Sequence, residues 1–114
     1  MAKSVIPGPL ERRHLIEKDL DPKAASTIAA AYLEEGRRHE AIEFLAKANE
    51  TDQLEALAEE AIELGDPFLL QSVTQAMDRE PDRATWDRCA DAAEAVGKDR
   101  HAATARRNAA RSEV

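Results

Sequence analysis

Residues 22–52 read PKAASTIAAAYLEEGRRHEAIEFLAKANETD, and two helical patterns meet there at Gly36. Asp21 and Pro22 are typical of a helix start, because Asp caps exposed amide groups and proline at the first helical position has no amide hydrogen to lose. Gly36 predicts the end of this helix, since glycine enters the left-handed conformation at little cost. A second helix is expected over residues 37–48, so the stretch predicts a helical hairpin.

The same arrangement recurs twice downstream. Gly65 and Gly97 each separate two helical patterns, and the three glycines are spaced by 29 and then 32 residues. Such a period indicates a helical repeat. We expect three hairpins, at about residues 22–50, 51–80 and 82–111.

A shorter helix is expected ahead of the repeats, over residues 10–20. Its apolar residues at helical spacing are Leu10, Leu15, Ile16 and Leu20. This face could cover the edge of the first hairpin. Residues 1–9 contain two prolines and one glycine without apolar periodicity, so they are expected to form a flexible tail.

Apolar stripes on the later helices predict the core. Their members are Ala41, Ile42, Leu45 and Ala48, then Leu54, Leu57, Ala58, Ala61 and Ile62, then Phe68, Leu70, Val73 and Met77, then Trp86, Cys89, Ala90, Ala93 and Val96. Beyond Trp86 large apolar side chains are few, and an alanine face contributes less than a leucine face to burial. We expect the last hairpin to be completed by a partner or by a second copy of the chain, or simply to fray.

Composition agrees with an all-α fold. The chain has 114 residues, enough for one domain over residues 10–114, and 23 of them are alanine while aromatic residues make up 4%. Closely packed helices suit this composition better than a sheet. The sequence predicts a short α-solenoid of about seven helices.

Charge is distributed unevenly. The formal net charge is −7; residues 34–66 hold eleven acids against three bases, whereas residues 98–114 hold five bases against two acids. The overall acidity argues against a general nucleic-acid binder. The single cysteine, Cys89, permits no internal disulfide, and no run is long and apolar enough for a membrane span. A cytoplasmic protein without a membrane partner is expected.

The stretch AYLEEGRRHEAIEFLAKA carries the closest family likeness. Its matching residues are Tyr32, Gly36, Ala41, Leu45 and Ala48. On these positions, and on Trp86 in the third unit, residues 22–110 resemble the tetratricopeptide repeat family, in which stacked hairpins share a core. Gly65 and Gly97 stand where Gly36 stands in the first unit.

The resemblance implies a concave binding face built from the first helix of each hairpin. Its expected residues are Ser26, Ala30, Leu33, Glu55, Glu59, Ile62, Asp87, Asp91 and Glu94. Five of these nine are acids, so the expected function is a protein-interaction or adaptor module whose acidic groove receives a basic or amphipathic segment of another protein.

Two alternatives remain open at this point. Small acidic tetratricopeptide-like proteins include secretion and assembly chaperones that hold an unfolded segment. Nucleic-acid binding could rest only on the basic residues of the last helix, namely Lys98, Arg100, Arg106, Arg107 and Arg111. That patch has no aromatic side chain for base stacking.

An enzyme is not expected. Glu11 and His14 have the spacing of one half of a di-iron site in a helical bundle, but no second such pair follows. His39 and His101 lack partners at ligand spacing. Cys89 falls on a predicted core position, and no glycine-rich phosphate loop is present. The sequence therefore predicts no catalytic residue, cofactor or metal.

Overall fold

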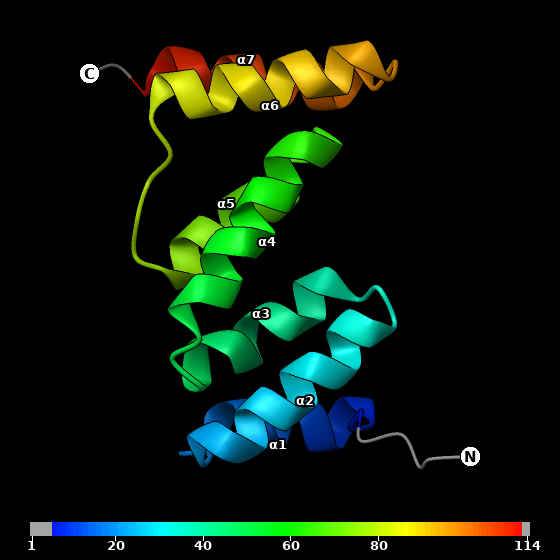
Figure 1. The fold of residues 1–114 in the computed structure, drawn as a ribbon, viewed down its shortest axis with the longest axis vertical. Coiled ribbons are helices and arrows are strands. Elements are labelled where there is room, and N and C mark those ends of the chain that lie inside the picture. The colour runs from blue at the N-terminus through cyan, green and yellow to red at the C-terminus, as the bar shows by residue number, and fades with distance from the viewer. Residues whose placement is uncertain (1–5, 113–114) are drawn as a thin grey trace. The chain divides into compact units, whose positions relative to one another are not determined.

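The computed structural model describes residues 6–112, and all regular structure in that range is α-helical. The helices are α1 (Pro9–Glu17), α2 (Pro22–Glu34), α3 (Arg38–Lys47), α4 (Thr51–Leu64), α5 (Pro67–Ala76), α6 (Arg83–Ala95) and α7 (Asp99–Arg111), as Figure 1 shows. The predicted all-α class is confirmed. So is the order of a short first helix followed by three pairs.

The described residues form two compact units that divide after Leu54, within α4. The first unit contains α1, α2 and α3, and α2 packs against α3. The second contains most of α4 together with α5, α6 and α7, and both α6 and α5 pack against α7. A single domain over residues 10–114 stays a prediction.

Aspartate begins three of the helices as the sequence predicts. Asp21 accepts hydrogen bonds from the backbone amides of Lys23 and Ala24, and Asp66 from those of Phe68 and Leu69. The carboxylate of Asp82 accepts from the amide and hydroxyl of Thr85 at 2.8 and 2.7 Å. These bonds satisfy amide groups that have no partner inside the helix.

Five helices end at a left-handed residue. Gly36, Gly65 and Gly97 have φ of 73°, 67° and 75°, as the sequence predicts. Asn49 and Asp78 adopt the same conformation at 56° and 57° after α3 and α5. At each end the amide of the following residue bonds to a carbonyl five positions back, such as Arg37 N to Tyr32 O at 2.9 Å. This is the Schellman arrangement, which satisfies the last carbonyls of a helix.

The first unit is built around two aromatic rings. Tyr32 and Phe44 are fully buried and stack with 5.8 Å between ring centroids. Arg12 of α1 covers both rings at 5.6 Å and donates hydrogen bonds to the Tyr32 hydroxyl and to the carbonyl of Glu40. The Arg37 guanidinium also lies over the Tyr32 ring, 5.0 Å from its centroid. Cation–π contacts therefore surround this core.

The predicted apolar face of the first helix is only partly confirmed, because Leu15, Ile16 and Leu20 are half-buried while Leu10 is exposed. No residue of α1 is buried, and Leu10 is 72% exposed. Arg12 provides the contacts that hold α1 to the unit. The helix also starts at Pro9, inside the expected tail of residues 1–9; of that tail, residues 1–5 lie outside the described range, and Pro7 is buried.

The second unit has an alanine-rich core next to a leucine-rich one. Leu69, Leu70 and Val73 of α5 are buried, whereas α6 and α7 meet largely through small residues. The buried small residues of that pair are Cys89, Ala90, Ala93, Ala102, Ala105 and Ala109. The thin core predicted for the last hairpin is confirmed. Two core predictions are wrong: Phe68 is half-exposed, with Leu69 buried in its place, and Val96 is exposed.

Gly65 is needed for close packing as well as for its conformation. A Cβ atom placed on it would lie 2.5 Å from the backbone nitrogen of Ala93. Gly36 and Gly97 have equally positive φ angles, but no atom lies within 4 Å of such a Cβ. The turn between α4 and α5 therefore packs directly on the backbone of α6.

Candidate functional site

Two of the nine residues expected to form the concave face lie together in the first unit. Ser26 and Ala30 of α2 line a shallow hollow of about 430 Å³ in the first unit, with Lys23, Thr27, Ala31 and Glu34. The Ser26 hydroxyl donates a hydrogen bond of 2.9 Å to Glu50. Leu33 is half-buried and does not line this hollow.

Glu55, Glu59 and Ile62 come together in the second unit. They line a groove of about 340 Å³ between α4, α5 and the segment that leads into α6. The other lining residues are Ala58, Leu70, Thr74, Met77, Arg79, Glu80, Pro81, Asp82 and Thr85. We call this the acidic groove, because four carboxylates line it against one guanidinium.

The floor of the acidic groove is apolar. Ile62 and Leu70 are 6% and 1% exposed, and Ala58 and Met77 are half-buried beside them. Ile62 therefore forms part of a wall and is not a projecting contact. An apolar floor with a charged rim is typical of sites that bind amphipathic segments.

The carboxylates of the groove differ in their partners. Arg79 reaches Glu55 at 3.6 Å and Arg88 reaches Glu59 at 2.6 Å, and this contact raises the pKa of Arg88. All four side chains are about half-exposed. Such exposed pairs contribute little to stability, so a ligand cation can exchange for the arginine.

Two more carboxylates complete the rim. Asp82 caps α6, and the hydrogen bonds from Thr85 lower its pKa, so it stays ionised at neutral pH. Within the described residues, Glu80 is exposed and its carboxylate has no ion-pair or hydrogen-bond partner. Glu80 thus provides a negative charge that no group of the unit neutralises.

Asp87, Asp91 and Glu94 form a separate cluster on α6. Arg106 of α7 contacts all three carboxylates, at 3.2, 2.7 and 3.1 Å. The hydrogen bond to Asp91 is the largest of the effects that raise the pKa of Arg106. We call this arrangement the Arg106 clasp. It ties α6 to α7, so these three acids stabilise the hairpin and do not line the acidic groove.

The clasp also changes the basic patch of the last helix. Arg106 forms ion pairs with the three carboxylates of the clasp. Lys98 donates a hydrogen bond of 3.1 Å to the carbonyl of Leu64. Arg107 and Arg111 bond to side chains one turn earlier on α7, at Thr104 and Asn108. Fewer basic side chains are therefore available to bind phosphate groups than the five bases counted in the sequence.

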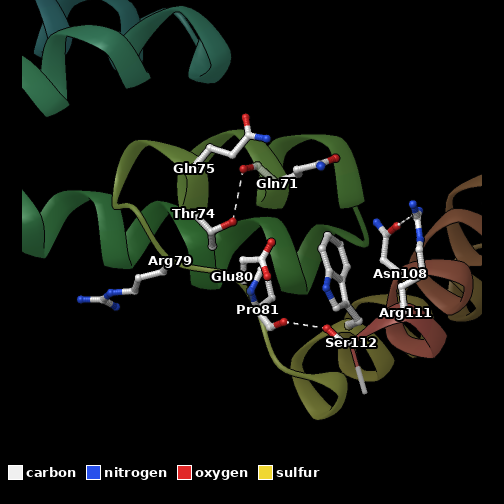
Figure 2. A pocket seen from close by; sticks show the side chains of 10 residues that line it. Gln71, Thr74, Gln75, Arg79, Glu80, Pro81, Asn108, Arg111 and Ser112 are labelled. Atoms are coloured by element: carbon white, nitrogen blue, oxygen red, sulfur yellow. Dashed lines mark hydrogen bonds between the residues drawn. The ribbon is translucent and has the colours of Figure 1, made fainter. Parts of the chain in front are cut away.

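A second hollow adjoins the acidic groove and was not expected from the sequence. It measures about 220 Å³, and Figure 2 shows Gln71 and Gln75 of α5 on one wall with Asn108 and Arg111 of α7 on another. Thr74, Arg79, Glu80, Pro81, Trp86 and Ser112 complete its lining. We call it the amide cavity. Its walls come from second helices of hairpins, whereas the repeat pattern directed attention to first helices.

The remaining candidate residues do not line the three hollows described above. Glu11, His14 and His39 are exposed. The His101 ring packs edge-on against the Phe68 ring, with 5.5 Å between the ring centroids. Burial raises the pKa of Cys89 to about 11, which opposes formation of a thiolate at neutral pH. Among residues 6–112 no group of three or more His, Cys, Asp or Glu side chains is arranged to hold a metal ion.

Comparison with protein-family models, with curated proteins and with solved structures gives no match to this chain. The tetratricopeptide resemblance therefore stays an expectation from the sequence. No helix within the described range is both long and apolar enough to cross a membrane.

Proposed function

We propose that this protein is a non-catalytic interaction module of tetratricopeptide-like design, and that its acidic groove binds a basic or amphipathic segment of another protein. The observation that carries the proposal is the juxtaposition of an apolar floor with four carboxylates, one of which, Glu80, has no partner among the described residues. A segment that alternates cations with apolar side chains has the matching chemistry.

Binding would proceed by exchange of partners. A ligand lysine or arginine would meet Glu80 directly and would displace Arg79 from Glu55 or Arg88 from Glu59. Because the displaced arginines return to water at an exposed surface, the cost is small. Ligand apolar groups would cover Ile62 and Met77, at about 25 cal/mol per Å² of apolar area removed from water.

The test uses a short capped peptide of alternating lysine and leucine, labelled for fluorescence anisotropy. Glu55→Lys/Glu59→Lys reverses two rim charges and should weaken binding by roughly 30-fold, since each reversal removes an attraction and adds a repulsion. Affinity for the parent protein should fall as salt is raised, because the rim is exposed.

A matched control is available in the first unit. Glu17→Lys/Glu43→Lys changes the net charge by the same amount at two exposed sites outside the groove. It should retain nearly the parent affinity. Equal weakening by both double variants would mean that the peptide responds to overall charge and not to the groove, and the proposal would fail.

A further inference from the structure

The amide cavity is lined by a residue whose polar group has no partner among the described residues. Trp86 is only 5% exposed and lines the cavity, and its indole N–H has no hydrogen-bond partner among the described residues. Every fully buried side-chain nitrogen and oxygen in that range does have a partner. The Trp86 N–H must therefore be reachable from outside, and the cavity is the opening that Trp86 lines.

Three carboxamide side chains line the same cavity as Trp86. Gln71 and Gln75 lie one turn apart on α5, are exposed, and make no side-chain hydrogen bond within the described residues. Asn108 on the opposite wall accepts one bond, from Arg111 at 2.7 Å, which leaves its amide hydrogens free. Figure 2 shows the Gln71 and Gln75 side chains on α5 and the Asn108 side chain on α7.

This set of groups matches the main chain of a peptide. A carboxamide presents a donor and an acceptor in one plane, and so does a peptide group, so the two can pair. A nucleobase is a poorer fit, because the ring of Trp86 is buried and offers no face for stacking. The cavity contains charges of both signs, since Glu80 lines it together with Arg79 and Arg111.

The amide cavity and the acidic groove share a boundary. Thr74, Arg79, Glu80 and Pro81 line both hollows. A chain that occupies the groove and continues past this boundary enters the cavity, and at about 3.3 Å per extended residue only a few residues are needed.

We propose that the amide cavity is a second subsite that grips the main chain of the same extended segment whose side chains occupy the acidic groove. The inference rests on the proposed function. The groove would select basic and apolar side chains, while Gln71, Gln75, Asn108 and the Trp86 N–H would hold the backbone independently of side-chain sequence. The ligand class is thus an extended peptide, and not a preformed helix, whose backbone groups are already bonded internally.

The single tryptophan makes the cavity observable, because all tryptophan emission comes from Trp86. The parent protein is titrated with the capped lysine–leucine peptide and with the same peptide methylated at its backbone nitrogens. The unmethylated peptide should shift Trp86 emission and bind about tenfold more tightly, since methylation removes hydrogen-bond donors that the carboxamides would accept.

Gln71→Met/Gln75→Met removes two carboxamides from an exposed helix face with little change in helix propensity. It should weaken binding of the unmethylated peptide by a similar factor. It should weaken binding of the methylated peptide less, because only the carbonyl groups of the methylated backbone remain available to the two carboxamides. Gln53→Met is the matched control, because Gln53 is an exposed glutamine in the first unit. Unchanged far-ultraviolet circular dichroism verifies that the variants fold.

The outcomes separate the two proposals. Peptide binding could depend on Glu55 and Glu59 but be unchanged by methylation and by the Gln71/Gln75 variant. In that case the inference about the amide cavity is overturned, while the proposed function of the acidic groove is retained. If neither peptide binds, the proposed function fails and the inference with it. If inorganic phosphate alone shifts Trp86 emission and Arg111→Met abolishes that shift, the cavity is an anion site and the peptide assignment is wrong.

Discussion

The hairpins α2–α3 and α6–α7 share one plan, a helix pair closed at a left-handed glycine, but they fill the space between their helices differently. The first places Tyr32 against Phe44, with arginines over the rings. The second brings alanines together and joins its helices on the outside through the Arg106 clasp. One hairpin is stabilised mainly by burial of large side chains, the other by close approach and surface charge.

The difference shows which kinds of change each hairpin tolerates. Removal of a large side chain should damage the first hairpin, because a cavity forms where surrounding atoms cannot follow. Addition of atoms should damage the second, because its helices meet largely through small buried residues and protein cores are closely packed. The following changes test this comparison.

Phe44→Ala should have the largest effect. Phe44 is fully buried, and loss of such a ring costs about 3–5 kcal/mol of unfolding free energy. Chemical denaturation followed by circular dichroism measures it. Phe68→Ala is the control, because Phe68 is 52% exposed, and it should cost much less. Equal losses would show that ring burial does not distinguish the two units.

Gly65→Ala should have the next largest effect, a loss of about 2–4 kcal/mol of unfolding free energy. The alanine must keep an unfavourable left-handed backbone conformation. Its Cβ atom also clashes with the backbone of Ala93. Gly36→Ala has the same backbone strain but open space around the Cβ, so it should cost only about 1–2 kcal/mol. Thermal unfolding of the pair isolates the packing contribution. Identical melting temperatures would contradict close approach at Gly65.

Arg106→Met should destabilise the second unit less than Gly65→Ala does, because its ion pairs are exposed to solvent. The loss should shrink as salt is added, since salt already screens these pairs in the parent protein. Trp86 fluorescence follows this unit directly. A salt-independent loss would indicate that the aliphatic part of Arg106, and not its charge, holds the hairpin.

Ionisation of the Cys89 thiol should have the smallest effect on the unfolding free energy, and it should have none at neutral pH. Burial raises its pKa to about 11 from an ordinary value near 9, so above pH 9 the unfolded chain loses the thiol proton while the folded chain keeps it. Stability from this group should therefore fall as pH rises from 9 to 11. Unfolding free energies of the parent and of Cys89→Ala, measured across that range, should converge. A constant difference would mean that the thiol does not titrate differently in the two states.

Local signals made the helices predictable from sequence. Asp21, Asp66 and Asp82 cap helices, and the three glycines end them, through contacts within a few residues. Which apolar residue faces inward was harder to predict. In Pro67–Leu70 every residue is apolar, so periodicity could not choose between Phe68 and Leu69.

The candidate site was predictable only in part. Glu55, Glu59 and Ile62 share a helix face, and the groove does contain them. Asp87, Asp91 and Glu94 form ion pairs with Arg106, and this depends on the distance between two helices. A sequence pattern contains no such distance. The amide cavity depends on the placement of α5 beside α7, so Gln71 and Asn108 carried no signal in the sequence.

The close approach of Gly65 to Ala93 also has a kinetic consequence. Most contacts of this all-α chain join residues fewer than 12 positions apart, and helical topologies of this kind fold in roughly microseconds to milliseconds, whereas Gly65 and Ala93 are 28 positions apart. Docking of the α4–α5 turn onto α6 requires the adjoining hairpin to present its backbone first. A bulky residue at position 65 should then accelerate unfolding more than it slows folding, as expected for a contact that forms after the rate-limiting step.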